Sequence, residues 1–182
     1  MLATADFSGM LICSRSGSMS SNDLRPLPNT PVTPNICRYN DNRLGAVYSS
    51  LHGFWTSRQA AISAAGQNAV AARRDAYSVV LFNHLVVTCI SNDFTSSPDV
   101  LLDTVVPLRA GGGTSYTEAL AGAQRLMVQH WSNERYAITI GRCRWSRLTS
   151  QRGPVLIFLS DGECTVSDAT VRSVCRAAID LG

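Results

Sequence analysis

Hydroxyl and carboxylate side chains follow apolar segments at three places in this sequence. The stretch "CSRSGSMSS" places Ser14, Ser16 and Ser18 two residues apart, directly after the apolar run "GMLIC". Thr114 follows three glycines, and Asp161 comes two residues after the apolar run "PVLIFL". These side chains are small, hard oxygen donors without an imidazole or a thiolate, a choice typical of sites for Mg²⁺, Mn²⁺ or Ca²⁺ rather than zinc or copper.

The elements that must position these residues follow an α/β order. Apolar runs indicate strands, and apolar residues at spacings of three and four indicate helices. Two β-branched runs separated only by Asn83 and His84 predict an antiparallel hairpin, because so short a connection cannot join parallel strands. In chain order the sequence predicts a strand over 8–13, a helix from Thr56 to about Arg74, a hairpin over 76–90, a short helix or turn over 96–105, a helix from Ser115, a strand over 153–159 and a helix capped by Ser167.

This order predicts an open, mostly parallel, Rossmann-like sheet with helices on both faces. Its central strands should be residues 8–13 and 153–159, and the hairpin should add an antiparallel edge strand. Ligands of open α/β sheets bind beyond the carboxyl ends of the strands, where the serines and Asp161 are expected. The residues expected to pack on the sheet are Ile62, Ala65, Gly66, Ala69 and Val70 in the first helix, Leu120, Ala123, Leu126 and Met127 in the second, and Val171, Val174, Cys175, Ala178 and Ile179 in the last.

Two segments show no regular pattern. Residues 20–54 contain four prolines between positions 26 and 34, among Asn, Ser and Asp, and residues 131–153 are rich in Arg, Ser and Trp. Such compositions interrupt helices and strands. We interpret both segments as irregular insertions into a single domain over 1–182.

Composition limits the possible partners. No run approaches the roughly 18 apolar residues of a membrane span, so no membrane partner is expected. The start "MLATADFSGM" lacks a basic flank and carries Asp6, unlike a secretory signal, which predicts an intracellular, cytoplasmic protein. The six cysteines are scattered, with no C-x-x-C pair and no histidine at zinc-finger spacing, which predicts free thiols rather than disulfides or structural zinc.

All sixteen basic residues are arginine, so chemistries that need a lysine, such as a P-loop or a Schiff base, are excluded. One local cluster of basic residues with a tryptophan could touch nucleic acid. With a net charge of only +3, a solvated loop is the simpler interpretation, and nucleic acid is not the expected partner. The cluster consists of Arg142, Arg144, Arg147, Arg152 and Trp145.

The fragments "SRSGSM", "GGGTSY" and "FLSDGE", in this order and separated by predicted helices, resemble the von Willebrand factor A-type (vWA) domain and its metal-ion-dependent adhesion site. The family pattern is Asp-x-Ser-x-Ser in the first loop, a Thr after a Gly pair, and an Asp in a Ser/Thr-Asp-Gly turn. The resemblance covers residues 8–19, 56–130 and 153–182. Each fragment alone is weakly specific, but three in register are strongly specific.

The resemblance implies a role for each of these positions. Ser16 and Ser18 would bind the metal through their hydroxyls, Thr114 would join when a ligand is engaged, and Asp161 would coordinate directly or through water. A carboxylate from a protein partner commonly completes the metal's ligand shell in this family. The resemblance therefore predicts a protein-binding module rather than an enzyme.

The sequence departs from the family pattern at Ser14, which stands where the family has Asp, and Arg15 adds a positive charge beside it. A hydroxyl in place of a carboxylate weakens the attraction for a divalent cation, although a serine oxygen can partly replace an Asp that acts through a bound water. Two alternatives therefore stay open: a weakened Mg²⁺, Mn²⁺ or Ca²⁺ site, and a degenerate vWA scaffold that binds partners without metal.

A serine hydrolase is a third alternative, from a different functional class. It receives little support, because the sequence has no G-x-S-x-G elbow and none of its three histidines follows a strand in the way that a hydrolase triad would require. The family also continues beyond the segment that ends here with "CRAAIDLG". We therefore expect a vWA-like domain that is truncated at the C-terminal edge, with the strand over 153–159 presenting an apolar open edge.

Overall fold

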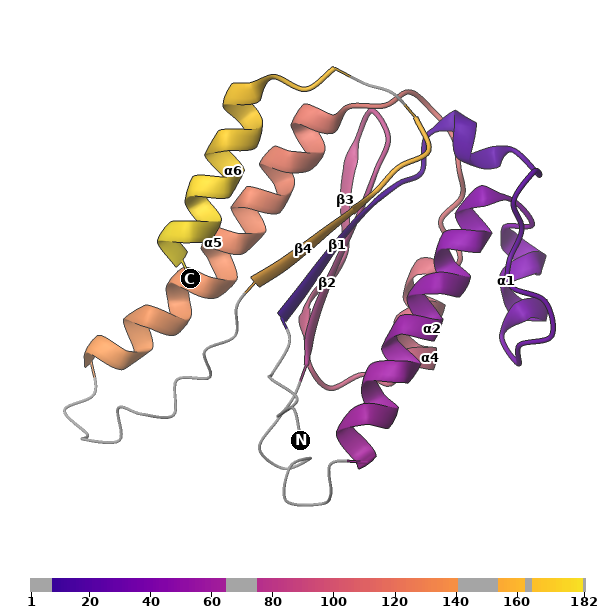
Figure 1. The fold of residues 1–182 in the computed structure, drawn as a ribbon, viewed down its shortest axis with the longest axis horizontal. Helices are drawn as coiled ribbons and strands as arrows, with labels where there is room; N and C mark the ends of the chain where they lie inside the picture. The colour runs from indigo at the N-terminus through magenta and orange to yellow at the C-terminus, as the bar shows by residue number, and fades with distance from the viewer. Residues whose placement is uncertain (1–7, 65–74, 141–153, 163–164, 182) are drawn as a thin grey trace.

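A four-stranded mixed sheet forms the centre of the computed structural model, which describes residues 8–64, 75–140, 154–162 and 165–181. The strand order is β3-β2-β1-β4 (Figure 1). β1 pairs in parallel with β2 on one side and with β4 on the other, and β3 pairs antiparallel with β2. The strands are β1 (Ser8–Ser14), β2 (Ala76–Phe82), β3 (Val86–Asp93) and β4 (Pro154–Leu159).

Helices cover both faces of this sheet, so the predicted α/β class is confirmed. α1, α2 and α4 lie on one face, and α5 and α6 lie on the other (Figure 1). The helices are α1 (Thr33–Tyr39), α2 (Arg43–Ala64), α4 (Pro98–Val105), α5 (Tyr116–Ile140) and α6 (Asp168–Leu181), with a short 3₁₀ helix η1 (Gly17–Ser20) after β1. Among the described helices, none is long and apolar enough to cross a membrane.

β1 and β2 are buried along their whole length, as expected of strands covered on both faces. Side chains alternate between the two apolar cores. Leu11 and Cys13 of β1 pack with α2 and α4, whereas Met10 and Ile12 pack with α5 and α6. Burial raises the pKa of the Cys13 thiol to about 12, and the four described cysteines are all free.

The predicted hairpin is confirmed. β2 and β3 pair antiparallel, with β3 at the edge of the sheet. Their connection spans residues 83–85, one residue longer than predicted, and contains His84. The expected short helix over 96–105 is α4, whose first turn is capped by the Ser97 hydroxyl.

The segment 20–54 is not an irregular insertion, because it contains α1 and the first half of α2. Pro34 lies in the first turn of α1, where a proline is tolerated because its missing N–H has no partner inside the helix. α2 begins at Arg43 instead of Thr56, and it buries Leu44, Tyr48, Leu51 and Trp55 at helical spacing. Of the inward face predicted for this helix, Ile62 is half-buried, and the others lie outside the described residues.

The prediction of an irregular segment over 131–153 was wrong for residues 131–140. Residues 131–140 continue α5, whereas 141–153, with the arginine and tryptophan cluster, lie outside the described residues. The inward face predicted for α5 is confirmed, since Ala123, Leu126 and Met127 are buried and Leu120 packs against them.

β4 lies at an edge of the described sheet, not at its centre, because within the described residues it pairs only with β1. The side chain of Val155 is accordingly 41% exposed. On the neighbouring helix α6, Val174 is buried and Ala178 packs against the core. The prediction was wrong for Val171 and Ile179, which are exposed together with Cys175.

Two glycines in α2 allow a matched test of this packing. A Cβ added at Gly45 would meet the backbone oxygen of Asn40 at 1.8 Å, whereas one at Gly53 meets nothing within 4 Å. We expect Gly45→Ala to lower the free energy of unfolding by about 3 kcal/mol, since backbone cannot yield easily. Gly53→Ala should raise it by about 0.5 to 1 kcal/mol, through the better helix propensity of alanine.

Urea unfolding of the two variants and the parent measures both changes. If Gly45→Ala were as stable as Gly53→Ala, Gly45 of α2 would not lie as close to the Asn40 backbone as the structure places it.

Candidate functional site

The serine loop leaves the carboxyl end of β1 and turns at once into η1. Ser14 is the last residue of β1, Ser16 precedes η1, and Ser18 lies within it. Ser14 and Ser16 are buried, while Ser18 is exposed. The turn is held locally, because the Ser16 N–H donates to Ser14 Oγ at 3.3 Å and Ser20 Oγ donates to the Gly17 carbonyl at 2.6 Å.

The three serine hydroxyls form a hydrogen-bonded chain that ends on Asp161. Ser14 Oγ donates to Ser16 Oγ at 3.1 Å, Ser16 Oγ lies 2.9 Å from Ser18 Oγ, and Ser18 Oγ donates to Asp161 Oδ1 at 2.9 Å. Each hydroxyl has one proton, and that of Ser18 is used on Asp161, so Ser16 must be the donor to Ser18. All three protons therefore run in one direction, toward the carboxylate.

Asp161 has a second partner at the start of α2. Its Oδ2 accepts from Arg43 Nη1 at 2.6 Å, and its side chain is only 15% exposed. Arg43 is the first residue of α2, and its own N–H donates to the Ser21 carbonyl at 3.0 Å. Both carboxylate oxygens of Asp161 are thus engaged, one by a serine and the other by a guanidinium.

The same arginine holds Asp23 with a two-pronged contact. Arg43 Nε and Nη2 donate to the two oxygens of Asp23 at 2.7 and 2.6 Å, a fork geometry that makes strong charge-assisted bonds. These hydrogen bonds hold the pKa of the Asp23 carboxyl well below its usual range. A carboxyl whose pKa is lower in the folded than in the unfolded state stabilises the fold at pH values above the unfolded pKa. The Arg43–Asp23 pair is therefore fully formed at neutral pH and weakens only in strong acid.

A second loop, between α4 and α5, is bonded to the serine loop through its backbone. The Gly17 N–H donates to the Gly112 carbonyl at 2.9 Å, and the Gly111 N–H donates to the Arg15 carbonyl at 2.8 Å. Buried Asn83, after β2, donates from Nδ2 to the Gly111 carbonyl at 2.7 Å. Gly112 has φ of +80°, and a Cβ there would meet His84 at 2.5 Å, so this position requires glycine.

This loop carries Thr114 to the rim of the site but not into the hydroxyl chain. Thr114 is half-buried, and within the described part of the chain its hydroxyl makes no hydrogen bond to Ser14, Ser16, Ser18 or Asp161. The structure therefore brings four of the five predicted residues into direct contact and places the fifth on the adjoining loop.

Tyr116 fixes the turn that holds Asp161. Its hydroxyl donates to the Gly162 carbonyl and lies 2.5 Å from Ser160 Oγ, on the two residues that flank Asp161. The ring packs edge-on against Phe82 and Phe158. Tyr116 stands inside the fragment "GGGTSY" but was not predicted as a site residue, since nothing local shows that it reaches a turn 44 residues away.

The positive charge expected from Arg15 comes instead from Arg43. The Arg15 side chain donates to the Arg109 carbonyl at 3.3 Å, whereas Arg43 contacts the carboxylate itself. The sequence prediction missed both Arg43 and Asp23, because they lie in the segment interpreted as an irregular insertion. Asp161 and Asp23 both contact Arg43, so these three side chains together carry a net charge of −1.

The donor set fits a hard cation by type but is poor in charge. Among the described residues, no group of three or more His, Cys, Asp and Glu side chains is placed to hold a metal ion. What converges is one carboxylate and three hydroxyls, with adjacent oxygens 2.9 to 3.1 Å apart. These spacings are those of hydrogen bonds between the groups themselves. The oxygens are hard donors of the kind that Mg²⁺, Mn²⁺ and Ca²⁺ take.

The serines are hydrogen-bonded to one another and to Asp161. Nucleophilic serine is commonly activated by an adjacent histidine, and among the described residues no histidine is bonded to Ser14, Ser16 or Ser18. His52 pairs with Asp99 at 2.9 Å, and His130 pairs with Ser91 at 2.7 Å. The described residues thus give the hydrolase alternative no support.

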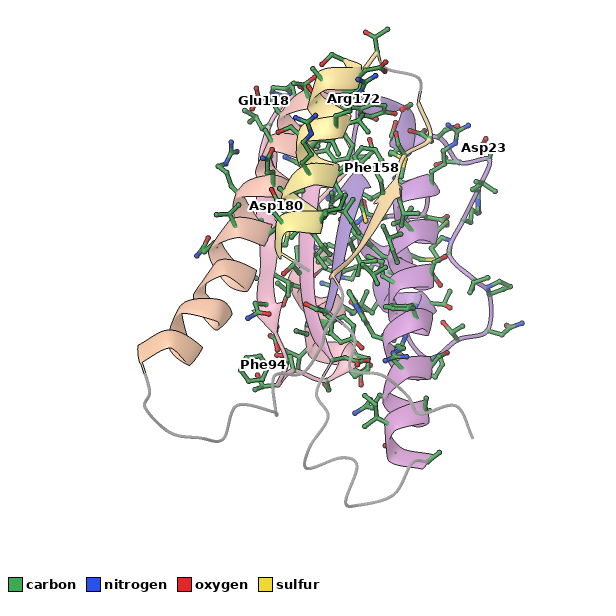
Figure 2. The ribbon with its side chains drawn as sticks, turned by 60° about the vertical axis from the view of Figure 1, so that its left-hand side comes forward. Asp23, Phe94, Glu118, Phe158, Arg172 and Asp180 are labelled. Atoms are coloured by element: carbon green, nitrogen blue, oxygen red, sulfur yellow. The ribbon has the colours of Figure 1, made fainter. Side chains whose placement is uncertain are left out.

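A mostly apolar hollow of about 300 Å³ adjoins the Asp161–Arg43 pair. Its lining comes from η1, the loop after it, the first turns of α2 and the end of β4. Figure 2 shows Asp23 beside this end of the sheet and Phe94 at the opposite end. The apolar residues that line the hollow are Met19, Leu24, Ala46, Val47 and Leu159.

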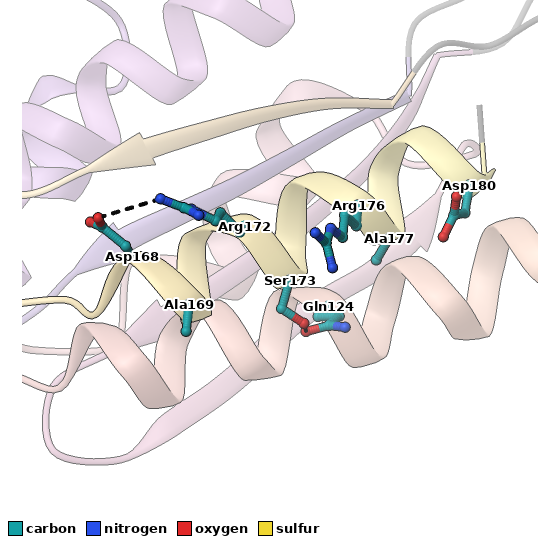
Figure 3. A pocket seen from close by; sticks show the side chains of 8 residues that line it. All are labelled: Gln124, Asp168, Ala169, Arg172, Ser173, Arg176, Ala177 and Asp180. Carbon is teal, nitrogen blue, oxygen red and sulfur yellow. Dashed lines mark hydrogen bonds and ion pairs between the residues drawn. The ribbon is translucent and has the colours of Figure 1, made fainter.

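A larger hollow, of about 620 Å³, lies over the outer surface of α5 and α6 (Figure 3). It is open and lined by polar helix residues, with Arg172 3.8 Å from Asp168 and Ser173 bonded to Gln124 at 3.3 Å. The first pair lies at helical spacing within α6, and the second joins α6 to α5. Both are ordinary contacts between exposed side chains, each of small energetic value. We therefore assign no site to this surface.

Comparisons of the sequence with protein-family profiles and with curated proteins found no match. The structure is similar to proximal thread matrix protein 1 from the mussel byssus, with a TM-score of 0.55 and 11% identity over 96% of this chain and 36% of that chain. A structure of the same mussel protein with a zinc-occupied MIDAS motif gives the same values.

A von Willebrand factor type A structure from Catenulispora acidiphila is similar with a TM-score of 0.49 and 16% identity, over 96% of this chain and 31% of that chain. This chain thus spans about a third of the length of these proteins. The likeness to the mussel protein bears on the fold alone, and the fold is vWA-like, as the sequence motifs indicated.

Removal of the Tyr116 hydroxyl tests how the Asp161 turn is held. We expect Tyr116→Phe to lower the free energy of unfolding by about 1 kcal/mol, because a part-buried carbonyl and hydroxyl lose a partner while the ring contacts remain. Tyr39→Phe is the control, since Tyr39 is half-buried and its hydroxyl has no hydrogen bond among the described residues. Denaturant unfolding measures both, and equal stabilities would show that the hydroxyl does not hold the turn.

Proposed function

We propose that this chain is a protein-interaction module that uses a divalent-cation site, formed by Ser14, Ser16, Ser18 and Asp161, at the carboxyl edge of the sheet. The observation that carries the proposal is the continuous contact of these four side chains, whose oxygens come from two segments 143 residues apart. A loop that only turned the chain would not need three hydroxyls directed toward one distant carboxylate.

The residues present define what each would do toward Mg²⁺ or Mn²⁺. Asp161 supplies the anionic ligand, and Ser16 and Ser18 supply neutral oxygens through their hydroxyls. Ser14, buried at the end of β1, supports the cluster through Ser16 and can hold a bound water. Thr114, whose hydroxyl has no hydrogen bond among the described residues, is the residue available to join when a partner binds.

A protein partner is supported by what surrounds the oxygens. The adjoining hollow is mostly apolar, and exposed Leu24 lines it. Protein interfaces combine such an apolar centre with polar contacts at the rim. A bound divalent cation would supply the chemistry to receive an anionic oxygen, so the proposed partner presents a carboxylate next to an apolar side chain.

A second candidate function is a vWA-like scaffold that binds its partner without metal. The ion pair between Arg43 and Asp161 favours it, because the only acidic ligand of the cluster is already neutralised at 2.6 Å. The two candidates differ in one observable. Partner binding that needs metal is lost in EDTA and restored by Mg²⁺, whereas binding by the scaffold alone is unchanged.

A carboxylate introduced at Ser14, where the family pattern has Asp, tests the cation site directly. We expect Ser14→Asp to tighten Mn²⁺ binding at least about tenfold, because ligand charge largely sets the affinity of such sites. Asp161→Ala should abolish Mn²⁺ binding. Calorimetric titration of the two variants and the parent with Mn²⁺ alone, after circular dichroism has verified folding, gives the three affinities.

Ser20→Asp is the matched control, since it adds the same charge two residues beyond Ser18 at an exposed side chain that bonds to Gly17 instead of the cluster. It should change Mn²⁺ affinity by less than about threefold, as expected of a screened surface charge. If Ser14→Asp and Ser20→Asp gave equal affinities, the serine oxygens would not act as a common site.

A further inference from the structure

Arg43 divides its hydrogen bonds unequally between two carboxylates. Nε and Nη2 bind the two oxygens of Asp23, and only Nη1 binds Asp161. The bond from the Arg43 N–H to the Ser21 carbonyl, 3.0 Å long, also fixes the start of α2 against the loop that carries Asp23. The guanidinium is therefore held in place without the help of Asp161.

This division allows Arg43 to release Asp161 while it keeps Asp23. A small rotation of the guanidinium plane breaks one hydrogen bond and leaves the two-pronged contact, which is the stronger attachment. The side chain is 26% exposed, so water can replace Asp161 at Nη1. The contact between Arg43 and Asp161 is thus reversible within the folded protein.

We infer that Arg43 is a built-in cation that competes with the divalent ion for Asp161 and thereby sets the metal affinity of the site. The inference rests on the proposed cation site. In the metal-free state the guanidinium neutralises the carboxylate that the ion needs. A divalent ion that binds Asp161 must displace Arg43 Nη1. The guanidinium then stays near the ion, because it remains hydrogen-bonded to Asp23, and its positive charge repels the ion.

Two physical effects act in the same direction. Only the fraction of molecules with a free Asp161 can bind, so the apparent dissociation constant is raised by the inverse of that fraction. The positive charge that remains near the bound ion also disfavours it, more strongly in a part-buried site than in open water. A single acidic ligand combined with an internal arginine gives a site that responds only to high cation concentration or to a partner that adds a second carboxylate.

Arg43→Gln tests the inference, because glutamine removes the charge and keeps an amide that can donate to Asp23. We expect this variant to bind Mn²⁺ at least about tenfold more tightly than the parent in calorimetric titration with the metal alone. Arg25→Gln is the matched control. Arg25 lies two residues after Asp23, pairs with Asp41 at 3.3 Å and has a side chain that is 62% exposed, so its loss changes net charge equally without freeing Asp161. It should shift the affinity by less than about threefold.

A charge-conserving variant guards against a purely structural explanation. Arg43→Lys keeps the positive charge but not the fork, and it should bind Mn²⁺ within about threefold of the parent if charge competition is the cause. Equal tightening in Arg43→Lys and Arg43→Gln would overturn the inference, because a change of packing would then explain both. Thermal unfolding with and without Mn²⁺ gives an independent readout, since a tighter ion raises the midpoint more.

The outcomes separate this inference from the proposed function. If the parent binds Mn²⁺ and Asp161→Ala does not, the cation site stands, and an unchanged affinity in Arg43→Gln overturns only the role of Arg43. If the parent, Arg43→Gln and the double variant Ser14→Asp, Arg43→Gln all fail to bind Mn²⁺ at millimolar concentration while folded, both the site and the inference are wrong.

Discussion

Parallel pairing of β1 with both β2 and β4 is the constraint on which the candidate site depends. The registers place Ser14 opposite Phe82, and Cys13 opposite Leu159. Three chain segments therefore leave the sheet at the same edge and at nearly the same height. The serine loop, Asn83 and the Asp161 turn meet there because the registers bring the carboxyl ends of these three parallel strands level with one another. The burial of β1 and β2 on both faces stabilises that arrangement.

The edge so formed is short of negative charge. A divalent cation in a part-buried site needs its charge balanced, and the cluster offers one carboxylate and three hydroxyls. Arg43 and Asp23 add a positive and a further negative charge beside it. Together with Asp161, these charged side chains carry a net charge of −1, whereas a site built around two acidic ligands without an arginine would carry −2.

Much of this could be predicted from the sequence, because the informative signals are local. The apolar runs predicted β1, the hairpin and β4, and polar residues after strands predicted Ser14, Ser16, Ser18 and Asp161 as neighbours. Four prolines hid the first half of α2, although Leu44, Tyr48, Leu51 and Trp55 repeat at helical spacing in it. Arg43 could not be assigned to the site, since its partner Asp161 is 118 residues away and no local pattern marks a pairing across the fold.

The direction of the serine chain gives Asp161 a role beyond that of a proposed ligand. A carboxylate can only accept, so it forces the proton of Ser18 toward itself, and through Ser18 it orders the rotors of Ser16 and Ser14. Each O–H bond is therefore fixed in one orientation. The remaining lone pairs of the oxygens already point in defined directions before a ligand binds. The entropy of ordering three side chains is lost during folding instead of during binding, so the cluster is preorganised by one charge at its end.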